Sequence, residues 1–123
     1  MFITGFAMVS IQVQKTLNEL GRMNISIRCL VNDSNIERVR SIQLLMSNTN
    51  IVSVTEEGVF WQDQELKQRA VAEGSVKNAT SSYLHMAIDA QNVTTNDGVT
   101  YFCSSTDQYK NSSIILDKSC LLY

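Results

Sequence analysis

The segment Asn96-Asp97-Gly98-Val99-Thr100-Tyr101-Phe102-Cys103 decides how this chain folds, because it sets an aspartate, a tyrosine and a cysteine at fixed offsets. Tyr101 stands two residues before Cys103. Upstream, residues 25–31 alternate apolar and polar side chains, so Cys29 shares one strand face with its apolar neighbours. The two segments predict two strands, each with a cysteine on its apolar face.

Further short apolar runs separated by turn residues recur along the chain, which contains no proline. Turns therefore rely on Asn, Asp, Ser and Gly. Residues 62–73 contain good helix formers, but we expect strand pairing to override that preference over most of 69–76. The remaining strands are expected near residues 9–13, 39–45, 51–55, 83–88 and 113–116. This pattern predicts one all-β domain spanning 1–123, with a strand core over about 8–118.

With Cys29, Asp97, Tyr101 and Cys103 placed, the chain resembles the immunoglobulin superfamily over nearly its whole length, most closely a variable-type or intermediate-type domain. The resemblance implies an immunoglobulin-like β-sandwich of two antiparallel sheets with Greek-key connections. It also implies a tyrosine corner, in which the Tyr101 hydroxyl bonds the backbone a few residues upstream.

The resemblance implies two further contacts. A disulfide between Cys29 and Cys103, 74 positions apart, would restrict the unfolded chain by roughly 4 to 5 kcal/mol on a chain-entropy argument; two buried free thiols are the alternative. In variable-type domains an Arg at the start of strand D commonly pairs with the Asp that opens the F-strand motif. Here these residues are Arg69 and Asp97, and two independent surface charges are the alternative.

Residues 39–45 and 51–55 also look like the amino-terminal immunoglobulin domains of molluscan fibrinogen-related and C-type-lectin-related immune proteins. In those domains strand C carries an aliphatic residue in place of the usual Trp, and this chain has Ile42 or Leu44 there. Trp61 is then expected to be partly buried. The likeness implies a recognition domain of an innate immune lectin-type protein. A cell-surface adhesion or receptor domain that pairs through its sheet face is the alternative.

Composition argues against other classes of function. A net charge of −2 without a Lys/Arg cluster gives no footprint for nucleic acid. The single histidine, His85, alternates with apolar residues and is expected on the surface, and Glu56-Glu57 is expected in a solvated loop. No phosphate loop, nucleophile elbow or zinc ligand set occurs in the sequence. We therefore predict a binding protein without cofactor or metal, not an enzyme.

Asn-X-Ser/Thr sequons indicate an oxidising, secretory compartment. There are five, at Asn24, Asn32, Asn78, Asn92 and Asn111. No run of 18 apolar residues that could span a bilayer occurs. Residues 1–8 make a poor signal peptide, so we expect a secreted or extracellular domain cut from a longer precursor.

The predicted ligand surface is the F–G loop over residues 105–111, where Gln108, Tyr109 and Lys110 offer aromatic area and adaptable hydrogen bonds. Asn35 and Arg38 in the B–C loop are expected beside it, with a protein or glycan as ligand. A glycan on Asn111 or Asn32 would mask the patch, which makes the sheet face the alternative surface. Cys120 is left outside the predicted bridge, so we expect it to be exposed and to pair with a neighbouring segment or chain.

Overall fold

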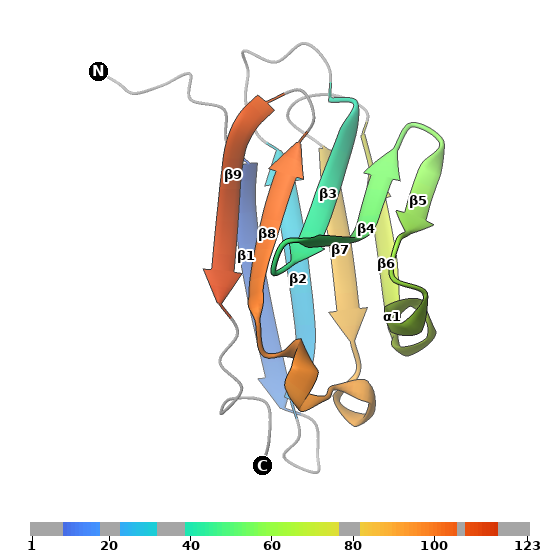
Figure 1. The fold of residues 1–123 in the computed structure, drawn as a ribbon, viewed down its shortest axis with the longest axis vertical. Coiled ribbons are helices and arrows are strands. Elements are labelled where there is room, and N and C mark those ends of the chain that lie inside the picture. The colour runs from blue at the N-terminus through green and yellow to red at the C-terminus, as the bar shows by residue number, and fades with distance from the viewer. Residues whose placement is uncertain (1–8, 18–22, 32–38, 77–81, 106–107, 116–123) are drawn as a thin grey trace, which may run out of the picture.

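The computed structural model describes residues 9–17, 23–31, 39–76, 82–105 and 108–115, which form a sandwich of two antiparallel sheets (Figure 1). The four-stranded sheet has the order β1-β2-β7-β6 and the five-stranded sheet the order β5-β4-β3-β8-β9. The strands are β1 (Val9–Leu17), β2 (Met23–Val31), β3 (Ser41–Met46), β4 (Thr49–Thr55), β5 (Gly58–Trp61), β6 (Ala70–Ser75), β7 (Ser82–Ile88), β8 (Thr100–Ser105) and β9 (Gln108–Ile115).

This strand order confirms the predicted fold class. The chain changes sheets between β2 and β3, between β5 and β6, and between β7 and β8. Lettered in chain order, the four-stranded sheet contains A, B, E and D, and the five-stranded sheet contains G, F, C, C′ and C″, as in variable-type immunoglobulin sandwiches. The architecture is therefore an immunoglobulin-like all-β sandwich with Greek-key connections.

The core lies between the sheets and is built from alternate residues of each strand. In β7 the burial alternates strictly, so that Leu84, Met86 and Ile88 face inward while His85 faces outward. Burying one such side chain contributes about 1.5 to 3 kcal/mol of hydrophobic free energy. The fully buried large side chains are Tyr101, Ile25, Ile27, Ile42, Leu44, Ile51, Leu66, Leu84, Met86, Ile88, Val31 and Val39.

A short helix, α1 (Gln64–Arg69), precedes β6 directly. Its N-cap is Asp63, whose Oδ1 accepts hydrogen bonds from the backbone N–H groups of Glu65 (3.1 Å) and Leu66 (3.0 Å). The helix ends at Arg69 because the next residues pair with β7, beginning with Ala70 opposite Ile88. Both the helical preference of this segment and its override by strand pairing are thus confirmed.

Two local features differ from the sequence prediction. Strand β5 was not expected; it forms a hairpin with β4 around Glu56 and Glu57, and Gly58 completes the turn with a φ of 129°, a conformation that disfavours side chains. The turn between β3 and β4 is shorter than expected, because the strands pair up to Met46 and Thr49.

A β-bulge at Ile51 joins β4 to the start of α1. The pairing of β3 with β4 runs from Leu44 opposite Val52 to Leu45 opposite Asn50, so Ile51 is an extra residue in β4. Its carbonyl accepts hydrogen bonds from the backbone N–H groups of Gln62 (2.9 Å) and Asp63 (3.1 Å). The bulge therefore holds the segment that follows β5 close to the sheet.

Candidate functional site

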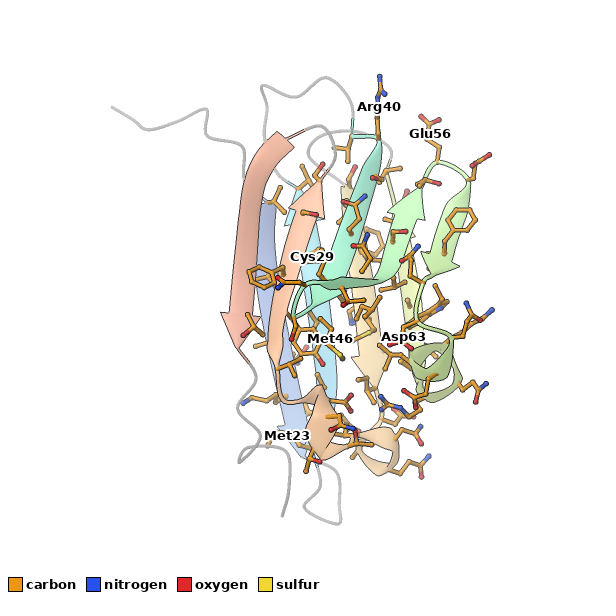
Figure 2. All side chains as sticks on the ribbon, viewed as in Figure 1. Met23, Cys29, Arg40, Met46, Glu56 and Asp63 are labelled. Atoms are coloured by element: carbon orange, nitrogen blue, oxygen red, sulfur yellow. A yellow bond between two sulfur atoms is a disulfide. The ribbon has the colours of Figure 1, made fainter. Side chains whose placement is uncertain are left out.

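A disulfide joins the two sheets at the centre of the core. Cys29 of β2 and Cys103 of β8 are bonded, with 5.6 Å between their Cα atoms, and neither is exposed. Figure 2 shows Cys29 between Arg40 at one end of the sandwich and Met23 at the other. Leu44 pairs with Cys103 in the neighbouring strand and is fully buried. The predicted bridge is confirmed, and aliphatic side chains fill the region where immunoglobulin sandwiches usually carry Trp.

Arg69 and Asp97 form the predicted ion pair. Arg69 Nη1 and Nη2 donate to the two carboxylate oxygens of Asp97 at 3.1 and 3.0 Å. The same guanidinium donates to the Asn92 carbonyl (2.7 Å) and to Glu65 (2.7 Å). The Asp97 side chain is only 1% exposed, so this pair fixes the connection between β7 and β8 from a buried position. Hydrogen bonding to Asp97 raises the pKa of Arg69, which therefore stays charged.

The tyrosine corner is also present. The Tyr101 hydroxyl donates to the Asp97 carbonyl at 2.8 Å, four residues upstream. Burial raises the pKa of the Tyr101 phenol, so the group stays protonated and remains a donor. Asp97 also accepts a hydrogen bond from the Thr94 N–H at 2.8 Å. Arg69 and Tyr101 thus both donate hydrogen bonds to the last residue of one short segment, η2 (Thr95–Asp97).

The predicted F–G loop is wrong in its extent. Ser105 belongs to β8 and pairs with Gln108, the first residue of β9, so only residues 106–107 separate the two strands. Gln108, Tyr109 and Lys110 lie in β9, an edge strand of the five-stranded sheet, and not in a loop. The reason is that β8 and β9 pair on both sides of these polar residues, with Cys103 opposite Ser112 and Ser105 opposite Gln108, and the register shifts between the two pairs. Asn35, Arg38 and Cys120 lie outside the described residues.

The predicted glycosylation sites fall in different parts of the fold. Asn24 lies in β2, where its Oδ1 accepts a hydrogen bond from the Ala90 N–H at 2.7 Å, at the start of η1 (Ala90–Asn92). Asn92 is half-exposed at the end of η1, and Asn111 lies in β9. Asn32 and Asn78 are outside the described residues. The Asn24 amide therefore has a structural role, and glycosylation at all five positions stays a prediction.

The outer side of the five-stranded sheet carries the surface that the sequence did not identify. Four of its five strands, β3, β4, β5 and β8, contain no charged residue, whereas the edge strand β9 contains Lys110. Phe60 of β5 is 45% exposed, and Leu45 of β3 lies directly opposite Phe102 of β8, both half-buried. We call this surface the uncharged face. Its outward residues include Phe60, Gln43, Leu45, Thr100, Phe102 and Ser104, together with Ser53, which is only 9% exposed.

The polar groups of the uncharged face bond one another. Ser104 Oγ donates to Gln43 Oε1 at 3.1 Å, and the Gln43 amide donates to Ser41. Gln62 Nε2 donates to Ser53 Oγ at 3.0 Å. Because these groups already have partners within the sheet, covering them with another surface would leave few donors or acceptors without a hydrogen bond. What remains to be covered is mainly apolar.

The outer side of the four-stranded sheet is different, since it carries charges. The His85 imidazole forms a hydrogen bond with Ser26 through Nε2. Its neighbours across the ladders are Arg28 of β2 and Glu73 of β6. Burial and the charge of Arg28 lower the pKa of His85, and Glu73 opposes them. The Arg28 guanidinium lies 5.6 Å from the centre of the Tyr83 ring.

The remaining candidate residues behave as the sequence predicted. Trp61 is half-buried against the core in β5, and Glu56 and Glu57 are exposed in the β4–β5 turn.

Among the residues that the structure describes, no three His, Cys, Asp or Glu side chains gather as metal ligands would. Within the same ranges, no helix has the length and apolar character needed to cross a bilayer.

No protein-family model matches the chain, and no curated protein sequence matches it either.

Proposed function

We propose that this chain is an extracellular recognition domain of the immunoglobulin type, which pairs through its uncharged face with a second copy of the same domain. The observation that carries the proposal is the absence of charged residues from β3, β4, β5 and β8, four of the five strands of this sheet, together with exposed Phe60. The centres of protein interfaces are depleted in charged residues and enriched in aromatic ones.

Self-pairing suits such a face better than pairing with a charged partner. In a two-fold symmetric dimer each residue meets the same surface of the other copy, so any charged side chain near the axis would approach its own kind. A face without charge avoids that repulsion. The opposite sheet carries Arg28 and Glu73 on its outer side, and this difference favours the five-stranded sheet as the pairing surface.

The size of the face indicates weak pairing. Four neighbouring strands about 4.8 Å apart, each with about six residues at 3.3 Å per residue, span a projected area of roughly 400 Å². Stable complexes bury about 800 Å² of accessible surface per partner. Even with a rim contributed by β9, we expect the dimer to form at micromolar to millimolar concentrations, as suits reversible contact between molecules.

The extracellular assignment is supported by the Cys29–Cys103 disulfide, because such bonds persist in oxidising compartments. Asn24 and Asn92 both lie outside the strands of the five-stranded sheet, so glycans at these two sequons would leave the uncharged face open, whereas Asn111 lies in the edge strand β9 of that sheet.

The immunoglobulin family is supported by the strand order, the tyrosine corner and the Arg69–Asp97 pair. A parent protein of the innate immune lectin type is supported by the aliphatic core positions Ile42 and Leu44, which were part of the likeness in residues 39–45.

The experiment that tests the proposal compares two exposed hydrophobic residues on opposite sheets. Phe60 is 45% exposed on the uncharged face and Val71 is 71% exposed on β6. Sedimentation equilibrium between about 10 μM and about 1 mM should show a monomer–dimer equilibrium, weakened about tenfold or more by Phe60→Asp.

The matched control is Val71→Asp, which adds the same charge to the other sheet and should leave the dimer unchanged. A wild-type protein that stays monomeric at about 1 mM overturns the proposal, and so does a Val71→Asp variant that dissociates as readily as Phe60→Asp.

A further inference from the structure

A hollow of about 500 Å³ lies on the outer side of the four-stranded sheet, opposite the uncharged face. Its volume falls within the range of small-molecule sites. It is lined by Gln12, Val13, Gln14, Ser26, Arg28 and His85. The hollow forms because the short side chain of Ser26 lies among longer ones that rise from β1, β2 and β7.

The lining offers one fixed cation and several groups that donate and accept hydrogen bonds. Gln12 lies opposite Arg28 across β1 and β2, and Gln14 lies opposite Ser26. The two side-chain amides and the Ser26 hydroxyl each can both donate and accept. Of the described lining residues, Arg28 alone presents a guanidinium, and its contact with the Tyr83 ring holds it over the sheet.

We propose that this hollow binds an acidic saccharide, with the carboxylate or sulfate of the sugar on Arg28 and its hydroxyl groups on Gln12, Gln14 and Ser26. Guanidinium groups match the two oxygens of a carboxylate or sulfate with parallel hydrogen bonds. A sugar supplies neighbouring hydroxyls that match the mixed donors and acceptors of the two amides.

The composition of the hollow favours a saccharide over an acidic peptide. A peptide with several carboxylates would need several cations. Among the described lining residues only Arg28 is a permanent cation, and Glu73 lies opposite His85 across the ladder. A nucleic acid strand would need a basic track along its backbone, and the described outer residues of this sheet do not provide one. A ligand with one anionic group per unit, surrounded by hydroxyl groups, fits this lining best.

This site is independent of the proposed function, because it lies on the other sheet. Binding of a saccharide can therefore succeed or fail whether or not the domain dimerises, and the Phe60→Asp variant separates the two. That variant, which should remain monomeric, should bind the sugar as the wild type does.

The experiment follows backbone amide shifts by NMR in unglycosylated protein produced with its disulfide in a bacterial periplasm. The probes are 3′-sialyllactose, lactose 3′-sulfate, neutral lactose and hexaglutamate. We expect the charged sugars to shift the amides of residues 12–14, 26–28 and 85, with a dissociation constant of about 1 mM or tighter. Neutral lactose should bind at least about tenfold more weakly.

Two variants with a matched control locate the anion. Arg28→Gln removes the guanidinium, and Gln12→Glu adds a negative charge of the same shape beside it; each should weaken binding about tenfold or more. Arg40→Gln removes an equal charge from an exposed arginine at one end of the sandwich (Figure 2) and should change binding by less than about twofold.

Each outcome decides for or against the site. Binding of only one charged sugar supports the proposal and identifies the anion as carboxylate or sulfate. The proposal is overturned by absence of shifts at these residues, by equal binding of neutral lactose, by preference for hexaglutamate, or by equal effects of Arg28→Gln and Arg40→Gln.

Discussion

Arg69 and Asp97, 28 residues apart in the chain, hold each other through two parallel hydrogen bonds of 3.0 and 3.1 Å. The pair joins the end of α1 to the segment just before β8. Asp97 is also the residue whose carbonyl receives the Tyr101 hydroxyl. The distant α1 and the nearby start of β8 thus both bond to one buried aspartate.

Removing the arginine should be costly. In Arg69→Met the Asp97 carboxylate keeps its buried position without its cation, and we expect a loss of about 3 to 5 kcal/mol in the free energy of unfolding. Glu65→Gln removes the other, 69% exposed carboxylate bound to Arg69 and should cost less than about 1 kcal/mol. Urea denaturation of both variants measures the difference, and equal costs would contradict the role of Asp97.

Tyr101→Phe should test the tyrosine corner separately. The change removes only the hydroxyl that donates to the Asp97 carbonyl and leaves the ring in the core. We expect a loss of about 1 kcal/mol, because one buried hydrogen bond is removed. Tyr83→Phe, on the outer side of β7, is the control and should be close to neutral in the same denaturation experiment. A neutral Tyr101→Phe would argue against the corner.

Loss of the disulfide should act mainly through the unfolded chain. Replacing Cys29 and Cys103 by Ala in one variant opens a closed loop with a sequence separation of 74. On the chain-entropy argument the loss is about 4 to 5 kcal/mol, plus a smaller packing cost for the two sulfur atoms. Adding reductant to the wild type should lower its midpoint of thermal unfolding about as much as the double Ala substitution does. A midpoint that changes in neither experiment would contradict the expected loss.

His85 should make stability depend on pH. Its pKa is lowered in the folded protein, so below the unfolded value of about 6.5 the unfolded chain binds the proton more readily than the folded one. Stability should therefore be full above pH 6.5 and fall as the pH drops toward the folded pKa.

The variant His85→Gln should lose this slope, and Glu73→Gln should steepen it, because Glu73 is the neighbour that raises the pKa. Denaturation midpoints measured across this pH range compare the two variants with wild type. Identical slopes in all three proteins would show that His85 does not contribute.

Gly74 and Gly58 should respond differently to Ala. A Cβ at Gly74 would lie 2.6 Å from the Tyr83 carbonyl oxygen and 3.3 Å from Val54 Cβ, so β6 would have to move, at a cost of about 1 to 3 kcal/mol. A Cβ at Gly58 meets open space, and only its φ of 129° opposes the change. Amide exchange should therefore show loosening of β6 in Gly74→Ala and only of the β4–β5 turn in Gly58→Ala.

The parts of the fold that the sequence predicted are those set by local pattern. Cys29 and Cys103 each stood in an alternating or motif-bearing strand, and the spacing from Asp97 to Cys103 identified the corner. Strand β5 was missed because it has only four residues, and its pairing with β4 depends on a turn at Glu56 and Glu57 without an Asn-Gly signal. Strand pairing also extended β9 into residues whose composition resembled a loop.

The uncharged face could not be predicted for a different reason. Each of β3, β4, β5 and β8 is short, and a charge-free run of four to seven residues is common by itself. Only the order of strands in the sheet shows that these four runs are neighbours. The hollow beside Arg28 is likewise a product of register, since it depends on Gln12 and Gln14 facing Arg28 and Ser26 across a ladder.

The bridge between Cys29 and Cys103 also determines how the domain would respond to a pulling force applied through positions on either side of it. With the disulfide intact, the segment between the two cysteines contributes only their 5.6 Å separation to the length of a stretched chain. Without it, the same 74 steps would contribute about 260 Å at roughly 3.5 Å per residue. In the oxidised domain a pulling force can therefore extend only the parts of the chain outside the two cysteines, and the segment between them cannot lengthen.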